Sequence, residues 1–138
     1  MIVLDTNVIS ELMIPEPDPG VVSWMNSQSS LTVWTTAITI YEIRFGLQSM
    51  PEGKKRSALL DLFERWLNNV IQRRIAAFDH AAAQSAADLA AAGKAAGRPR
   101  DPRDTMIAGI VLANHATLAT RNVRHFEDIA ERVVNPWE

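Results

Sequence analysis

The sequence contains no cysteine among its 138 residues. Disulfide bonds and thiolate metal ligands are therefore excluded. The sequence also lacks an apolar run long enough to cross a membrane, and it lacks a basic start followed by a long apolar stretch, so we expect neither a membrane-spanning helix nor a secretory signal. Together these absences favour a protein of the reducing cytoplasm.

Positive charge is also scarce, because 14 Lys and Arg residues face 16 Asp and Glu residues, for a net charge of −2. The protein as a whole has no positive charge that would indicate a nucleic-acid partner, so RNA or DNA would have to be bound by local positively charged patches. The three histidines show no metal-ligand spacing and lie near expected helix ends, where solvated or capping roles are the ordinary ones: His80, His115 and His125.

What the sequence does contain is typical of one globular domain. Hydrophobic residues make up 47% of it, with only 6 Gly and 7 Pro. The length suits a single buried core, so we treat residues 1–138 as one domain. Short apolar runs predict five strands, at Met1–Leu4, Leu31–Thr35, Ile75–Phe78, Thr117–Thr120 and Val133–Val134.

Helical patterns occupy the segments between these runs. Thr36 and Asp79 are expected to cap the helices that follow them, Gly97 and Pro99 to end the alanine-rich helix from His80 to Ala96, and a charged loop to lead into a helix that starts at Asp104. Pro15, Pro17, Pro19 and Gly20 are expected to break the first helix. Strands that alternate with helices predict an α/β fold with three layers, α/β/α, around a central, mostly parallel five-stranded sheet.

Four polar residues from separate segments are expected at one edge of this sheet. Asp5 directly follows the first strand, where the ligand crevice of an open α/β sheet lies. Glu42 and Asp104 belong to early turns of two helices, and Asn122 follows the fourth strand. Three converging carboxylates would repel one another and raise their pKa values unless a cation compensated. All-oxygen ligands favour Mg²⁺ or Mn²⁺, and hydrolysis of a phosphodiester is the most economical chemistry for such a site.

Each of these residues also has a structural alternative. Asp5 would serve equally as a helix N-cap, Glu42 could close a capping box with Thr39, Asp104 could complement a helix dipole, and Asn122 could be an ordinary turn residue. Five arginines flank Asp104 and Asn122, and they could contact phosphates or pair on the surface with Asp101, Glu127 and Asp128: Arg98, Arg100, Arg103, Arg121 and Arg124.

Several of these segments together resemble a PIN-domain ribonuclease, and the resemblance covers essentially the whole chain. They are MIVLDTNVISE at residues 1–11, AITIYEIRFG at 37–46, DTMIA at 104–108, and ATRN at 119–122 ahead of His125 and Phe126. More narrowly, the chain is similar to the VapC toxins of bacterial type II toxin–antitoxin pairs. Its ending, with Asn135, Pro136 and Trp137, resembles the FitB-like branch.

The resemblance implies Mg²⁺- or Mn²⁺-dependent cleavage of RNA, with transfer RNA among the candidate substrates, and dimerisation. It also implies inhibition by a VapB- or FitA-type antitoxin, through which alone operator DNA would be reached. The acids that the family uses as metal ligands fall on Asp5, Glu42 and Asp104. Its fourth, usually acidic, position falls on Asn122, which gives up one negative charge and weakens the case for a second metal ion.

The resemblance also assigns a positioning or phosphate-binding role to Thr6, and Arg103 and Arg121 are the arginines expected to contact phosphates. Two other classes of function stay open. One is a PIN-like module that binds an antitoxin without cleaving RNA. The other is a phosphatase with Asp5 as nucleophile, which would need a second acid two residues later, where the chain has Asn7. Four tryptophans offer apolar area for an interface: Trp24, Trp34, Trp66 and Trp137.

Overall fold

The computed structural model describes all residues, 1–138, and contains one five-stranded sheet. Its strands are β1 (Ile2–Leu4), β2 (Val33–Thr36), β3 (Ile75–Ala76), β4 (Thr117–Ala119) and β5 (Val133–Val134). The strand order is β3-β2-β1-β4-β5, and every neighbouring pair is parallel. The predicted sheet is therefore confirmed, and it is parallel throughout.

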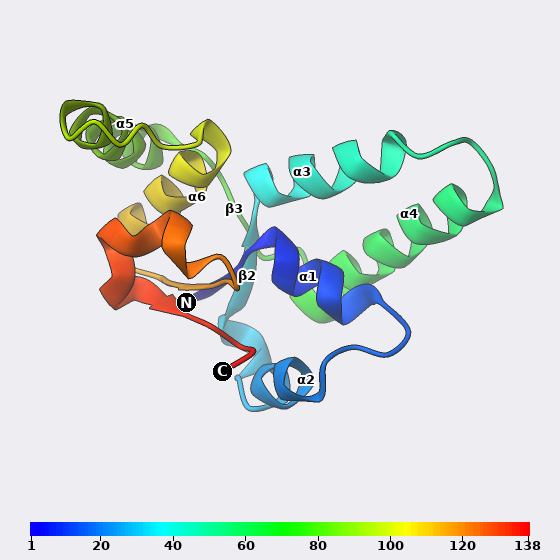
Figure 1. Cartoon of the computed structure of the whole chain (residues 1–138). Helices are drawn as coiled ribbons and strands as arrows, with labels where there is room; N and C mark the ends of the chain where they lie inside the picture. Colours follow the sequence, from blue (N-terminus) through cyan, green and yellow to red (C-terminus); the bar gives the residue numbers. More distant parts are fainter.

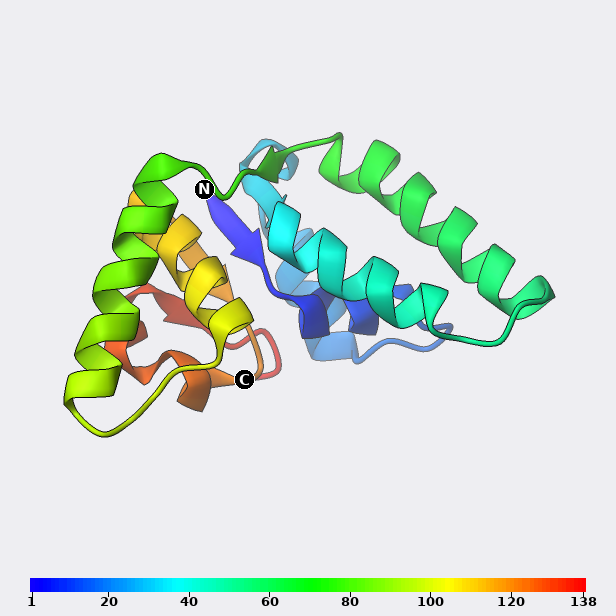
Figure 2. The same cartoon turned by 90° about the horizontal axis from the view of Figure 1, so that it is seen from above.

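Helices cover both faces of this sheet, which confirms the three-layer α/β/α fold (Figures 1 and 2). They are α1 (Thr6–Met13), α2 (Pro19–Asn26), α3 (Ala37–Gln48), α4 (Lys54–Trp66), α5 (His80–Ala95) and α6 (Pro102–Ala113), with a short 3-10 turn η1 (Ser30–Thr32), a π turn η2 (Leu67–Ile71) and a kinked 3-10 segment η3 (Val123–Arg132). No helix is both long and apolar enough to span a membrane.

The central strand β1 is buried on both faces, as its all-apolar sequence predicts. Leu4 belongs to the core beneath α1 to α4, which includes Phe63, whereas Val3 belongs to the core beneath α6 and η3, which includes Ile107 and Phe126. Val3 and Leu4 are both 0% exposed, and each such burial stabilises the fold by about 1.5–3 kcal/mol. These contacts hold Asp5 at a fixed position at the end of β1.

The ends of several helices lie where the sequence predicts them. The hydroxyl Oγ1 of Thr36 accepts a hydrogen bond from the Thr39 N–H at 2.9 Å, and Oδ1 of Asp79 accepts one from the Ala82 N–H at 3.0 Å. Both side chains satisfy backbone donors that a first helical turn leaves free. Gly97 follows α5 with a φ of +72°, a left-handed conformation that glycine adopts at little cost.

Four of the five strands are shorter than predicted; β1 and β4 each lack one terminal residue, and β2 and β3 differ more. β2 begins at Val33, because residues 30–32 form the 3-10 turn η1, and β3 ends at Ala76 rather than at Phe78. Apolar patterning marks where a strand is buried, but backbone pairing decides where it starts and ends. Thr35 and Thr36 pair with Ile75 and Ala76, and the pairing stops there.

The first helix ends at Met13, so the helix is broken where the prolines predict it. Pro19 and Gly20 then open α2, since Oδ1 of Asp18 accepts the Gly20 N–H at 2.8 Å and a proline at the first helical position loses no hydrogen bond. One helix begins earlier than predicted because an aspartate caps it. This helix, α6, starts at Pro102, and Oδ1 of Asp101 accepts the Asp104 N–H at 3.0 Å. Asp104 therefore lies within the first turn of α6.

Helices α5 and α6 pack closely, and Gly109 makes this approach possible. A Cβ atom at Gly109 would lie 2.5 Å from the Ala82 carbonyl oxygen and 2.7 Å from the Ala86 Cβ. Both neighbours belong to α5 and are buried, so neither can move aside easily. At Gly46 on α3, by contrast, a Cβ atom would meet nothing within 4 Å.

We expect Gly109→Ala and Gly46→Ala to change the free energy of unfolding in opposite directions. Gly109→Ala should destabilise the protein by about 1–3 kcal/mol through overpacking. Gly46→Ala should stabilise it by up to about 1 kcal/mol, because alanine has the higher helix propensity. Urea denaturation of the wild type and both variants measures the change in the free energy of unfolding. Equal stability of Gly109→Ala and the wild type would show that α5 and α6 are not in close contact.

Candidate active site

The candidate site lies at the carboxyl ends of β1 and β4. In the sheet, β2 and β3 lie on one side of β1, and β4 and β5, which come later in the chain, lie on its other side. Between β1 and β4 the winding direction therefore reverses, and in open α/β sheets ligands bind in the crevice at such a point. Leu4 pairs with Ala119, so Asp5 and Thr120 leave the sheet side by side.

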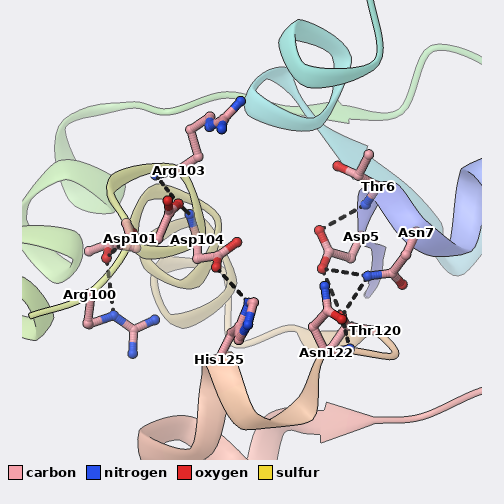
Figure 3. A network of polar contacts seen from close by, with 11 residues as sticks. Asp5, Thr6, Asn7, Arg100, Asp101, Arg103, Asp104, Thr120, Asn122 and His125 are labelled. Carbon is pink, nitrogen blue, oxygen red and sulfur yellow. Dashed lines mark hydrogen bonds and ion pairs between the residues drawn. The ribbon is translucent and has the colours of Figure 1, made fainter. Parts of the chain in front are cut away.

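Asp5 is buried, with only 4% of its surface exposed, and its carboxylate is held by three donors. The Thr6 N–H donates to Oδ1 at 2.8 Å. The Thr120 hydroxyl donates to Oδ2 at 2.8 Å, and the Asn7 amide lies 3.4 Å from the same oxygen (Figure 3). The helix-capping role that the sequence leaves open for Asp5 is therefore real, and it is combined with a fixed position at the carboxyl end of β1.

Asn7 and Thr120 also tie the loop after β4 to the start of α1. Oδ1 of Asn7 accepts the Arg121 N–H at 3.0 Å, and its amide nitrogen donates to the Thr120 hydroxyl at 3.2 Å. The Asn122 N–H donates to the same hydroxyl at 3.1 Å. Asn122 thus enters the network through its backbone, while its exposed side chain does not cap the segment that follows.

Asp104 approaches the site from α6, in the layer on the other side of the sheet from α3. Figure 3 shows the carboxylates of Asp104 and Asp5 facing the same space from opposite sides. Oδ2 of Asp104 lies 3.0 Å from Nδ1 of His125, and 22% of the Asp104 side chain is exposed. Asp104 is also an acidic residue in the first turn of its helix, so it complements the helix dipole as well.

Glu42 completes the carboxylate group from α3. It is half-buried, and its Oε1 atom is shielded from solvent without any hydrogen-bond partner. The capping-box alternative for Glu42 is wrong, because the box needs a cap at Thr39, whereas α3 is capped by Thr36 and Thr39 lies inside the helix. An unpaired buried carboxylate oxygen is costly, so its position calls for a ligand that supplies positive charge.

The electrostatics show that the three acids share one region. Burial raises the pKa of Asp5, of Glu42 and of Asp104 above the ordinary values. The negative charge of Asp104 raises the pKa of Asp5 further, and the charges of Asp5 and Asp104 both raise the pKa of Glu42. Asp101, next to α6, acts on Asp104 in the same direction. Acids from three distant segments therefore interact electrostatically.

This donor set fits a hard divalent cation that retains water. All three side chains offer oxygen, and the unpaired Glu42 Oε1 is available for an additional contact. No group of three or more His, Asp and Glu side chains is placed so that it could hold a metal ion directly. Magnesium usually keeps several waters and takes one or two carboxylates, so such a partial set suits it.

The arginines near the site divide into two groups. Arg100 pairs with Asp128, and Nη1 of Arg98 lies 3.8 Å from Glu127 Oε1, which is the surface pairing that the sequence left open. The charge of Arg103 instead lowers the pKa of Glu42, which places this exposed residue near the carboxylates. The Arg121 guanidinium lies 5.0 Å from the centre of the Trp137 ring, a cation–π contact at the exit of β4.

Three residues that contact the acids were not singled out from the sequence as site residues: Asn7, Thr120 and His125. Thr120 and Asn122 both follow β4, so the strand-end argument that selected Asn122 applies equally to Thr120. His125 is exposed, as expected of a solvated histidine, but it also contacts Asp104, which the sequence did not predict. A cleft of about 700 Å³ is lined by Asp104 and His125, together with Arg100 and Arg124 among other residues.

Comparisons with known proteins identify the family of this chain. Residues 2–132 match the PIN domain family. The chain is 41% identical over 138 residues to the VapC ribonuclease Y4jK of Sinorhizobium fredii, and 35% identical over 137 residues to the toxin FitB of Neisseria gonorrhoeae, covering 99% of each relative. The solved FitAcB structure from Neisseria gonorrhoeae matches with a TM-score of 0.90 at 35% identity, over 100% of this chain and 99% of that one.

The raised pKa of Asp5 predicts how stability depends on pH in the presence of EDTA. Because the folded-state pKa exceeds the unfolded value of 3.8, protonation of Asp5 favours folding, and this contribution is lost as pH rises through the raised value. Asp5→Asn cannot ionise. We therefore expect its unfolding free energy, relative to that of the wild type, to increase from about pH 4 to pH 7.

Urea denaturation of both proteins across this range measures the difference. Mg²⁺ added at neutral pH should stabilise the wild type more than Asp5→Asn, because the ion compensates the carboxylate charge. A difference between the two proteins that does not change with pH would contradict the raised pKa of Asp5.

Proposed function

Because this chain belongs to the PIN-domain family and, within it, to the group of VapC and FitB toxins, we propose that it is a Mg²⁺- or Mn²⁺-dependent endoribonuclease. We propose further that it acts as the toxin of a type II toxin–antitoxin pair. The observation that carries this proposal is the convergence of Asp5, Glu42 and Asp104 at the winding reversal of the sheet, with raised pKa values and an unpaired Glu42 oxygen.

Asp5, Glu42 and Asp104 would hold the cation, with waters completing its coordination. Asn122 leaves the sheet beside Asp5, and its side-chain carbonyl can accept a hydrogen bond from a bound water. An asparagine at this position contributes no charge, which favours one strongly held ion over two. Thr6, Asn7 and Thr120 each donate to Asp5 and so fix the direction of its carboxylate.

A bound Mg²⁺ or Mn²⁺ supplies Lewis-acid polarisation of a phosphoryl oxygen and lowers the pKa of a bound water. The protein's own residues would position the RNA substrate relative to the ion. Arg103, whose charge reaches Glu42, and Arg121, beside Trp137, would bind the phosphates on either side of the bond that is cut. The Thr6 hydroxyl is buried without a hydrogen-bond partner, and it would accept or donate a bond when substrate binds.

We also propose that an antitoxin of the VapB or FitA type binds and inhibits this chain, and that operator DNA is reached only through the antitoxin. Support comes from the solved FitAB complex bound to a DNA fragment, which matches 100% of this chain with a TM-score of 0.89 at 35% identity. We propose that the protein acts in the cytoplasm, on RNA substrates that include transfer RNA.

A homodimer is part of the same proposal, and its interface would use exposed apolar side chains. The tryptophans favoured from the sequence pack largely against this chain's own cores. The large apolar side chains that remain exposed are Ile14, Leu31, Tyr41, Phe45 and Val123, and among them Tyr41 and Phe45 stack on α3 with ring centres 6.1 Å apart.

We expect the protein, freed of any antitoxin, to cleave structured RNA in Mg²⁺ or Mn²⁺ and to lose this activity in EDTA. Asp5→Ala and Asp104→Ala should each reduce the cleavage rate by about 10³-fold or more, since a metal ion contributes several kcal/mol to transition-state stabilisation. Gel analysis of a panel of transfer RNAs measures the rate and identifies the substrate.

Asp61→Ala provides the matched control, because Asp61 is an exposed acid on α4 and should not alter cleavage. Circular dichroism should show that all three variants are folded. Cleavage that survives both EDTA and the Asp5→Ala and Asp104→Ala substitutions would contradict the proposal. Full cellular toxicity of Asp5→Ala would instead support a module that binds a partner without cleaving RNA.

A further inference from the structure

The turn after β4 contacts two of the three acids at once. We call residues 120–125 the β4 turn. At its start, the Thr120 hydroxyl donates to Oδ2 of Asp5 at 2.8 Å. At its end, Nδ1 of His125 lies 3.0 Å from Oδ2 of Asp104 and forms a hydrogen bond with that carboxylate (Figure 3). One short segment therefore links an acid on β1 with an acid on α6.

The two donors are connected to each other inside the turn. The backbone N–H of Asn122 donates to the Thr120 hydroxyl at 3.1 Å, and the backbone carbonyl of Asn122 accepts a hydrogen bond from the backbone N–H of His125 at 3.0 Å. The Arg121 N–H donates to Asn7 at 3.0 Å, which ties the middle of the turn to α1. A displacement of one donor would therefore disturb the other.

Both ends of the β4 turn are also anchored in the folded core. Thr120 is 0% exposed, and its N–H donates to the Val134 carbonyl at 3.0 Å. Phe126, directly after His125, is likewise 0% exposed and belongs to the core beneath α6. The His125 side chain itself is 56% exposed, so its contact with Asp104 is not explained by burial of the imidazole.

We infer that the β4 turn is a positioning device that sets the separation of Asp5 and Asp104 for a shared divalent cation, with Thr120 and His125 as positioning residues. This inference rests on the metal site of the proposed function. An ionised carboxylate offers about four lone-pair sites. Asp5 accepts three hydrogen bonds and retains about one site for the ion, whereas Asp104, with His125 as its side-chain partner, retains more. Removal of such outer contacts typically reduces metal affinity by about 10–100-fold.

The test is the dissociation constant for Mn²⁺, measured from the electron paramagnetic resonance signal of the free ion. Thr120→Val and His125→Ala should each weaken Mn²⁺ binding by about 10–100-fold. Thr120→Ser retains the hydroxyl and should bind nearly as tightly as the wild type. His125→Asn retains a donor near the Nδ1 position and should recover affinity, whereas His125→Gln should not.

His80→Ala serves as the control, because His80 is an exposed histidine at the start of α5. It should leave Mn²⁺ affinity unchanged. His125 is exposed as well, so His125→Ala tests the inference without disturbing the core even if Thr120→Val proves unstable. Wild-type Mn²⁺ affinity in a folded His125→Ala variant would overturn the inference, as would a wild-type protein that binds no Mn²⁺.

RNA cleavage by the same variants separates this inference from the proposed function. A positioning role predicts that saturating Mn²⁺ restores most of kcat in His125→Ala. A kcat that stays low while Mn²⁺ affinity is normal would mean that His125 contacts the substrate, and the positioning role would be wrong. If the wild type shows the expected Mn²⁺ pattern across the variants but cleaves no RNA, the proposed function fails and the positioning role stands.

Discussion

The pairing of β1 with β4 is the constraint on which the rest of the site depends. These two strands come from opposite ends of the chain, and their register sets Leu4 beside Ala119. Asp5 directly follows β1 and Thr120 directly follows β4. The buried Asp5 carboxylate therefore accepts its hydrogen bond from the Thr120 hydroxyl at the point where the winding direction of the sheet reverses. Neither residue could be fixed in this way by its own local segment. The site is therefore a product of the sheet's topology.

This arrangement places like charges together at a cost in stability. Burial and the charges of neighbouring carboxylates raise the pKa values of Asp5, Glu42 and Asp104, so ionisation of these acids opposes folding. The cost is offset by the cores on either side, where Val3 and Leu4 of the same strand are fully buried. Natural proteins break local rules of stability mainly at functional sites, and the unpaired Glu42 oxygen is such a break.

Features that depend on local sequence were predicted well. Apolar runs located all five strands, and Thr36 and Asp79 cap the helices that follow them. Strand ends were predicted less well, because pairing with a neighbour, and not composition, ends β3 at Ala76. The early start of α6 was missed because Asp101, which caps it, had been considered only as a surface partner for arginine.

The contacts that orient the acids could not be predicted, because each joins residues that only the tertiary fold brings together. Asn7 and Thr120 are separated by 113 positions in the sequence, and no local pattern links them. His125 was set aside because a lone histidine without ligand spacing is usually solvated, yet here it contacts an acid on a different element. Sequence patterns indicate which side chains carry charge, whereas the fold decides which neighbours orient them.

We propose that Asp5, Glu42 and Asp104 together hold one divalent cation. The most direct measurement is an anomalous difference map from crystals of the protein soaked in Mn²⁺. We expect a single strong peak in the space bordered by these three carboxylates, and no such peak in crystals of Asp5→Ala. A map without a peak there at saturating Mn²⁺, or with its only peak away from Asp5 and Asp104, would contradict this proposal.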